Sequence, residues 1–193
     1  MKKIILILIT FFAFSITNAQ DSKGYIGVSI GAAFPGGELT SNGNDAGTGL
    51  NLGLINMGYR FSENFGATLN WGGTAFSDNT YSSVIYAVGY FAVGPMVSFP
   101  LNDKIAFDLK PQIAFTSGSY DTGDLGYGKL QLANSTGFML GSSMNFSLAK
   151  HWAISLNLDY LSTKFAAYND GIIQLDEAKI STVNTSLGIQ YKF

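Results

Sequence analysis

Few side chains in this chain could carry out chemistry, and the histidine is the first to consider. His151 is the single histidine among 193 residues, and there is no cysteine. A neutral imidazole can activate a serine hydroxyl, but His151 stands between Lys150 and Trp152 in a short break that predicts a turn. Without cysteine there is neither a thiol nucleophile nor a His/Cys zinc site. We therefore expect no enzyme, no cofactor and no metal centre.

Carboxylates are the second group, and many of them fall in four polar segments that separate apolar ones. Asp121-Thr122-Gly123-Asp124 lacks the full spacing of an EF-hand loop. Solvated loop tips explain the group, and weak capture of Ca²⁺ or Mg²⁺ is the sharper alternative. Tyrosines in the same segments are interpreted as a girdle at a membrane boundary or as anchors for a partner. The acidic residues, eight against three lysines and so near −5 in net charge, are Glu38, Asp45, Asp78, Asp121, Asp124, Asp170, Asp176 and Glu177; the lysines are Lys129, Lys164 and Lys179, and the tyrosines Tyr81, Tyr120, Tyr127 and Tyr168.

The third group consists of polar side chains that stand singly inside apolar segments. From residue 105 to residue 115 every second residue is apolar, and most of the positions between are polar. A period of two is the signature of a β-strand with one apolar and one polar face. The polar residues singled out in this segment and two later ones are Asp108, Lys110, Gln112, Asp159 and Lys192.

Eight such segments follow one another and predict the elements that hold these side chains. Tight connections alternate with longer polar ones along the whole chain. That alternation is typical of an antiparallel up-and-down barrel with short turns at one end and longer loops at the other. The segments are 24–34, 48–61, 65–76, 84–99, 105–116, 136–148, 152–163 and 179–193.

The composition indicates what surrounds the apolar faces of these strands. Charged residues make up 12% and aromatic residues 14%, with 23 glycines. After residue 20 no apolar run approaches the roughly 18 residues of a transmembrane helix. We therefore predict an all-β fold, an eight-stranded antiparallel transmembrane β-barrel whose apolar faces meet lipid. A soluble barrel of the lipocalin type, with the apolar face inside, is the architectural alternative.

The pairing register supports this fold. Around a turn centred on Asp103, opposed residues are consistently apolar, as matched strand faces require. In the second segment the apolar phase slips at Leu54–Ile55, which predicts a β-bulge. Pro95 and Pro111 each remove a ladder hydrogen bond, so we expect a shared local distortion with a bulge or a water there. The opposed pairs are Phe99–Phe107, Val97–Leu109, Pro95–Pro111 and Val93–Ile113.

The start of the chain reads as an export signal. Two lysines precede the largely apolar Ile4–Ile16, and the small residues of Thr17-Asn18-Ala19 follow. We predict a cleaved signal peptide over residues 1–20 and a single barrel domain over residues 21–193. Removing the two lysines leaves 9 basic residues (11 minus 2) against 13 acidic ones, a charge of −4. Nucleic acid is not an expected partner of such a chain.

The final segment alternates to its last residue and carries a family resemblance. Its polar-x-Gly-x-x-aromatic-x-aromatic pattern resembles the C-terminal assembly signal of bacterial outer-membrane proteins. With the signal peptide, the eight strands and the glycine-rich inner face, the chain resembles small outer-membrane β-barrel proteins of the OmpA-barrel/OmpX type. The resemblance implies integral outer-membrane localisation and assembly by periplasmic chaperones and the barrel-assembly machinery. The residues of the signal are Ser186, Gly188, Tyr191 and Phe193.

The family resemblance says little about the activity of the protein. An eight-stranded barrel is only just wide enough for its own side chains, so the inward polar residues predict a network that fills the lumen. We expect a monomeric, non-enzymatic protein that supports the membrane or presents its loops to an external partner, in contact with outer-membrane lipids including lipopolysaccharide. The alternatives are a narrow transport or ligand-binding barrel for small or hydrophobic solutes and, less favoured, a lipid-modifying enzyme. The topology disfavours the enzyme because it puts His151 in a periplasmic turn.

Overall fold

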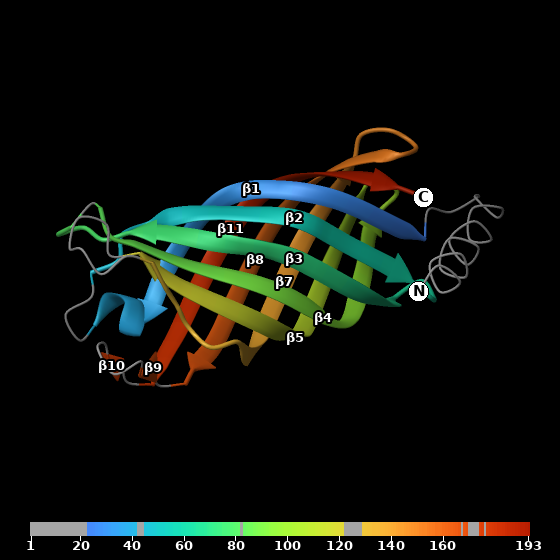
Figure 1. Cartoon of the computed structure of the whole chain (residues 1–193). Coiled ribbons are helices and arrows are strands. Elements are labelled where there is room, and N and C mark those ends of the chain that lie inside the picture. Colours follow the sequence, from blue (N-terminus) through green and yellow to red (C-terminus); the bar gives the residue numbers. More distant parts are fainter. Residues whose placement is uncertain are drawn as a thin grey trace, which may run out of the picture.

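The computed structural model describes residues 23–41, 45–81, 83–121, 129–166, 168–169, 174–175 and 177–193. Eight long strands in this part of the chain form one antiparallel sheet (Figure 1). No helix in the described part has the length and hydropathy to cross a membrane. The long strands are β1 (Gly24–Gly37), β2 (Gly49–Arg60), β3 (Phe65–Ser77), β4 (Ile85–Asn102), β5 (Ile105–Asp121), β7 (Ser135–Ser147), β8 (Trp152–Phe165) and β11 (Ala178–Lys192); the short elements are η1 (Glu38–Thr40), β6 (Lys129–Gln131), β9 (Tyr168–Asn169) and β10 (Gln174–Leu175).

The sheet closes on itself. Strand β1 pairs with β2 on one side and with β11 on the other, where Val28 lies opposite Ile189. The β4–β5 pairing joins the remaining ends of the sheet. Closure matters because lipid cannot satisfy the backbone groups of an open strand edge. The predicted eight-stranded antiparallel barrel is confirmed.

The barrel has two unlike ends. At the turn end, residues 61–64, 103–104 and 148–151 make tight connections, and β1 begins beside the end of β11 (Figure 1, right). At the loop end lie the longer connections, including η1, β9 and β10 (Figure 1, left). The predicted alternation is therefore confirmed, with the short connections at one end of the barrel and the long ones at the other.

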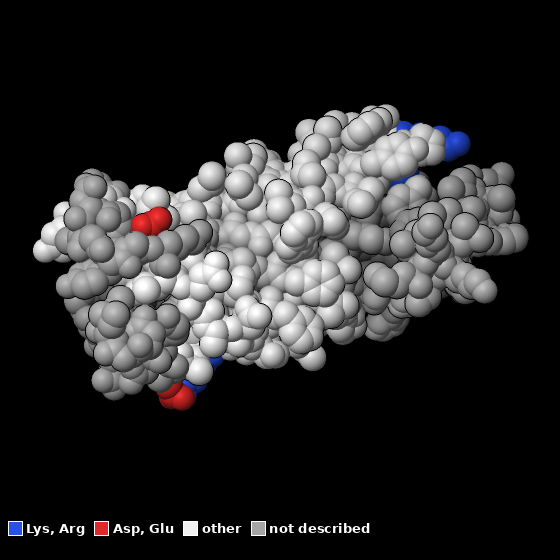
Figure 2. Space-filling model, viewed as in Figure 1, with Lys and Arg blue, Asp and Glu red and all other residues white. Residues whose placement is uncertain are grey.

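The outer wall is apolar and the inner face is not. Leu187 and Ile113 are 58% and 57% exposed, whereas Gln112, the neighbour of Ile113 in sequence, is 2% exposed and Lys110 is fully buried. Figure 2 shows charged side chains only near the two ends of the visible face. The predicted facing is confirmed, and the lipocalin-like alternative, which needs the apolar face inside, is excluded.

The register agrees with the predicted pairs. Phe99 lies opposite Phe107 and Val93 opposite Ile113. The shift in the β2–β3 ladder falls between Gly53 and Ile55, so the predicted bulge is confirmed. Around the opposed prolines, the β4–β5 ladder is interrupted between Val93 and Val97, yet the register is the same on both sides. The expected distortion is present there, but it is a gap in the ladder without a bulge, because no residue is inserted.

The predicted ends of β1, β4 and β5 were wrong, and β4 continues past residue 99 to Asn102. Strand β5 continues past residue 116 to Asp121, still paired with β4 and then also with β6, and β1 continues through Pro35 to Gly37. In β5 the apolar alternation stops because Ser117 and Ser119 replace large outward residues, but backbone pairing does not need apolar side chains. Strands therefore extend beyond the segment that their side-chain pattern marks.

The lumen is divided along the barrel axis. Toward the turn end most of its side chains are polar or small, as predicted, and the large inward exceptions are Tyr25 and Met96. Toward the loop end they are largely apolar and form one buried cluster, which the prediction of a wholly polar filling missed. The cluster consists of Ala33, Leu39, Ala46, Phe76, Val84, Tyr86, Val88, Tyr90, Ala92, Ala114, Met139, Leu161, Phe165 and Ile180.

Candidate functional site in the barrel lumen

Asp108 organises the polar half of the lumen. Strand alternation turns it inward from β5, and it is 2% exposed. Ser98 Oγ donates to its Oδ1, and Asn145 Nδ2 donates to its Oδ2 at 2.7 Å. Both carboxylate oxygens are thus engaged by neighbouring strands, so Asp108 ties β4, β5 and β7 together.

Lys110 lies in the next layer, between two carboxylates. It is fully buried and shares the inward face of β5 with Asp108, while Asp159 reaches toward it from β8. Gly141 of the intervening strand β7 makes this approach feasible: a Cβ at that position would lie 2.6 Å from Asp159 Oδ1 and 3.5 Å from Lys110 Cε. Since buried charges are costly unless compensated, this layer holds one cation against two nearby anions.

Amides fill the space beside these charges. Gln112 Oε1 accepts a hydrogen bond from Asn70 Nδ2 at 3.0 Å. Asn157 Nδ2 donates to Ser186 Oγ at 3.2 Å, which links β8 to β11. These side chains come from four of the long strands, β3, β5, β8 and β11. Hydrogen-bonded side chains from different strands therefore extend across the turn half of the lumen.

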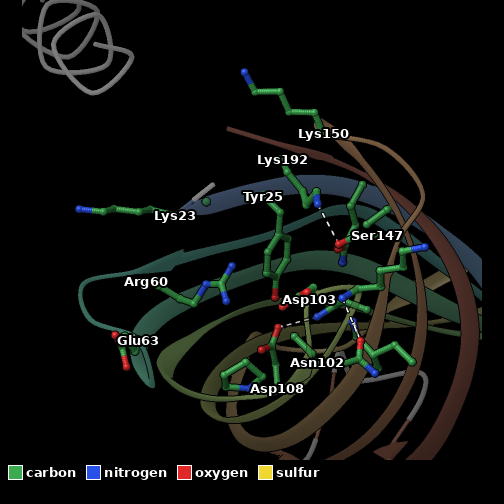
Figure 3. Close-up of a pocket in the computed structure, with 18 of the residues that line it drawn as sticks. Lys23, Tyr25, Arg60, Glu63, Asn102, Asp103, Asp108, Ser147, Lys150 and Lys192 are labelled. Atoms are coloured by element: carbon green, nitrogen blue, oxygen red, sulfur yellow. Dashed lines mark hydrogen bonds between the residues drawn. The ribbon is translucent and has the colours of Figure 1, made fainter. Parts of the chain in front are cut away.

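Lys192 is separate from this group, although the sequence placed it in the same polar network. Its Nζ donates to Ser147 Oγ at 2.8 Å, at the turn end of the lumen. There the side chains line a cavity of about 740 Å³ that opens at that end (Figure 3). The five predicted lumen residues thus divide into a buried group, Asp108, Lys110, Gln112 and Asp159, and one residue at the mouth.

Hydrogen bonds to Asp78 form a clasp between two loops at the loop end, next to the apolar cluster. Asp78 accepts hydrogen bonds from the backbone amides of Tyr81 at 2.9 Å and Thr80 at 2.8 Å, and from Tyr86 Oη at 3.1 Å. The amide of Asp45, from the preceding loop, also donates to it. These donors, Tyr81 first, hold the pKa of Asp78 below its usual value, although burial opposes them. The prediction that Asp78 is a solvated loop tip was wrong.

Sequence reasoning missed the apolar cluster for an identifiable reason. Along β4 from Ile85 to Phe91, both faces are apolar or aromatic, with Tyr86, Val88 and Tyr90 inward. A strand buried on both faces loses the alternation that marks its inward side. The signal was present as a continuous apolar run, and it indicates a packed lumen at that level.

The residues of the predicted assembly signal lie at the seam where the barrel closes. Ser186 points inward and Tyr191 outward, and Phe193 N donates to Gly24 O at 2.9 Å. At Gly188 a Cβ would lie 2.5 Å from Ser155 Oγ and 2.8 Å from Val28 O, so a side chain there would crowd both neighbouring strands.

His151 lies in the β7–β8 turn, as predicted. Its ring stacks on Tyr191 with centroids 5.5 Å apart, and Nδ1 lies 3.0 Å from Lys192 O. These contacts attach the turn to the end of β11. The described residues contain no group of three or more His, Cys, Asp or Glu side chains that could hold a metal ion.

Several predictions fall outside the described residues. They concern the signal peptide over residues 1–20, Asp124, Tyr127, Asp170 and Asp176. Of the other acidic loop residues, Glu38 accepts from Lys179 N at 3.3 Å, and Glu177 pairs with Lys164 at the exposed surface.

A closed antiparallel barrel with an apolar wall and a filled lumen defines an integral transmembrane β-barrel. The model of the outer membrane protein β-barrel domain family matches residues 4–193, and the chain belongs to that family. It is thus an outer-membrane β-barrel protein, of the OmpA/OmpX-like fold that the sequence indicated. In such barrels the short turns face the periplasm.

Solved structures show the same fold. Neisserial surface protein A matches with a TM-score of 0.66 at 14% identity, covering 89% of this chain and 98% of its own. OprG from Pseudomonas aeruginosa matches with a TM-score of 0.55 at 12% identity, covering 89% and 97%. Ail, the attachment invasion locus protein of Yersinia pestis, matches with a TM-score of 0.50 at 17% identity, covering 89% and 99%. No curated protein matches the chain.

Proposed function

We propose that this chain is a non-enzymatic, non-conducting outer-membrane barrel that supports the membrane or presents its outward loops to external partners. The observation that carries the proposal is the buried apolar cluster across the loop half of the lumen. Phe76 and Phe165, which are 1% and 0% exposed, belong to it. Water and ions need polar groups along their path, so a cross-section packed with apolar side chains favours a closed barrel.

The loops support the surface role. Asp78 joins two loops through the amides of Asp45 and Tyr81, and Tyr86 packs against Tyr120 with ring centroids 5.1 Å apart. A held loop surface loses less conformational entropy when a partner binds. The one histidine of the chain is engaged in the opposite turn, which supports a role without catalysis.

Planar-bilayer recording tests the closed lumen. We expect the purified protein to give no discrete current steps. The double substitution Phe76→Ser and Phe165→Ser should admit ions, whereas Phe138→Ser on the outer wall should not, since Phe138 is 49% exposed. Reproducible steps from the unsubstituted protein would overturn the proposal in favour of a narrow transport barrel.

Cross-linking in intact cells tests the surface role. A photoreactive residue at Tyr81, which is 57% exposed at the loop end, should capture lipopolysaccharide or an external partner. A matched label at Lys150, in a turn at the opposite end, should instead capture periplasmic proteins. Identical products from both positions would contradict the proposed orientation.

Export and assembly complete the proposal. We propose cleavage after Ala19 or Gln20, insertion by periplasmic chaperones and the barrel-assembly machinery through the Ser186–Phe193 segment, and a monomeric state in the membrane. Mass spectrometry of the protein from the membrane should give a chain that begins at Gln20 or Asp21. Native mass spectrometry should give the mass of a monomer. An uncleaved chain or a stable dimer would contradict these points.

A further inference from the structure

A groove of about 440 Å³ lies on the outer wall, in the loop half of the barrel. The side of the groove nearer the turn end is a row of three outward aromatic rings. Trp71 lies opposite Phe91, and Phe91 lies opposite Phe115, with the centroids of the two phenyl rings 6.5 Å apart. All three rings are exposed on the wall. They form a continuous apolar edge that crosses β3, β4 and β5.

The next row of the wall, one step toward the loops, lacks large side chains. Gly89 of β4 lies opposite Ser117 of β5 in this row. A Cβ at Gly89 would lie 3.0 Å from Ser117 Oγ, so the two positions share one narrow strip of the surface. This strip is the floor of the groove, and the aromatic row is its wall. Beyond β5 the groove reaches Asn134 and Thr136, where β7 begins.

The polar side chains of the groove are available to a ligand. Ser117, Asn134 and Thr136 are exposed, and their side chains make no hydrogen bond to any other described residue. Ser135 differs, because its Oγ donates to Lys164 O. No charged residue of the described part of the chain lines the groove. The groove therefore suits a neutral ligand that has one apolar face and several hydroxyl groups.

We propose that this groove binds a sugar ring of an outer-leaflet glycolipid. A pyranose ring has a face of C–H groups that packs on an aromatic ring, and hydroxyl groups at its edge that exchange hydrogen bonds with serine, threonine and asparagine. Aromatic rows on a barrel wall mark the boundary between hydrocarbon and headgroups. The floor of Gly89 and Ser117 is on the loop side of that boundary, level with the headgroups.

The acyl chains of such a glycolipid follow the apolar wall on the other side of the aromatic row. A phospholipid offers this wall the same chains but no ring with hydroxyl groups, so the groove favours the glycolipid. The proposal rests on the outward orientation of the loops. It depends neither on the closed lumen nor on a loop partner, and the following experiment requires neither.

Tryptophan fluorescence tests the site, because Trp71 lines the groove and the second tryptophan, Trp152, begins β8 at the turn end. The variant Trp152→Phe, in micelles of lauryldimethylamine oxide, is titrated with digalactosyldiacylglycerol, a neutral glycolipid. We expect a saturable change in the emission of Trp71. The converse variant Trp71→Phe, which reports from Trp152, should give no saturable change. The absence of a saturable change at Trp71 would overturn the proposal.

Two substitutions of Ser117, each combined with Trp152→Phe, test the floor of the groove. Ser117→Ala removes a hydroxyl and should weaken binding by about fivefold to tenfold, which is the loss of one hydrogen bond. Ser117→Leu also fills the groove and should abolish the saturable change. The matched control Ser142→Leu makes the same exchange on the outer face of β7, outside the groove, and should leave the affinity within about twofold. Circular dichroism confirms that each variant is folded.

The other possible occupants give different results. An equal response to phosphatidylglycerol, which has a charged headgroup without a sugar, would assign the groove to acyl chains and overturn the proposal, as would an unchanged affinity in Ser117→Ala. A change in Trp71 emission that follows the protein concentration without glycolipid would assign the groove to a second copy of the chain. Lipid A, which has a disaccharide headgroup, should bind at least as tightly as the galactolipid. Binding of lipid A no tighter than that of phosphatidylglycerol would contradict the assignment to an outer-leaflet glycolipid.

Discussion

The two halves of the lumen share one wall of eight strands and differ in almost everything else. In the loop half, aromatic and aliphatic side chains such as Phe165 pack into a single cluster that needs no directional contacts. In the turn half, each group requires a partner, as Asp108 does with Ser98 and Asn145. The apolar half is packed with buried side chains, and the polar half leaves room for a cavity of about 740 Å³. A barrel of fixed width can thus be packed toward one end and hollow toward the other through its inward residues alone.

The strongest test of the apolar half removes one of its fully buried rings. Phe165→Ala leaves a void where Phe165 now packs beside Gly118, and it should lower the free energy of unfolding by about 3–5 kcal/mol. Urea unfolding in phospholipid vesicles, followed by tryptophan fluorescence, measures the loss. The control Phe115→Ala truncates an outward ring that is 52% exposed and should cost less. Equal losses of unfolding free energy in the two variants would contradict tight packing of the inner cluster, because an inner ring would then contribute no more than a ring that faces lipid.

The matching test of the polar half removes its buried cation. Lys110→Met removes the buried positive charge that faces Asp159, and it should cost about 3 kcal/mol of unfolding free energy. The paired variant Lys110→Met with Asp159→Leu removes one charge of each sign and should recover most of that loss. Additive losses in this double-mutant cycle would contradict the coupling across Gly141.

The smallest effect concerns the clasp above the apolar half. Asp78→Asn removes the charge that the amides of Thr80 and Tyr81 contact. Their protection from hydrogen exchange should fall by about tenfold, which is the loss expected for one charge-assisted hydrogen bond. Because the pKa of Asp78 is lowered in the folded protein, its contribution is present above the unfolded pKa and is lost as the pH falls through the folded value. The parent should therefore lose protection on acidification and Asp78→Asn should not; equal pH dependence would rule out Asp78 as the titrating group.

Much of the architecture was predictable because strands in lipid alternate strictly. The outward position of Leu187 and the register of Phe99 with Phe107 followed from a period of two and the position of one turn. The strand ends were less predictable: β5 reaches Asp121 because its backbone remains paired after its large outward residues end. The inward face of β4 could not be predicted from alternation, because residues 85–91 are apolar or aromatic on both faces.

The sequence by itself determined the wall: which residues face lipid, how many strands there are, and which end has the tight turns. Lipid imposes this pattern on every second residue, so it can be read locally. Only the tertiary structure decided what fills the lumen, because strands far apart in sequence meet at the axis. The approach of Asp159 to Lys110 across Gly141 and the shared cavity of Arg60 and Lys192 depend on the closure and stagger of the whole sheet. No local periodicity encodes them, since each strand contributes only one side chain to each layer.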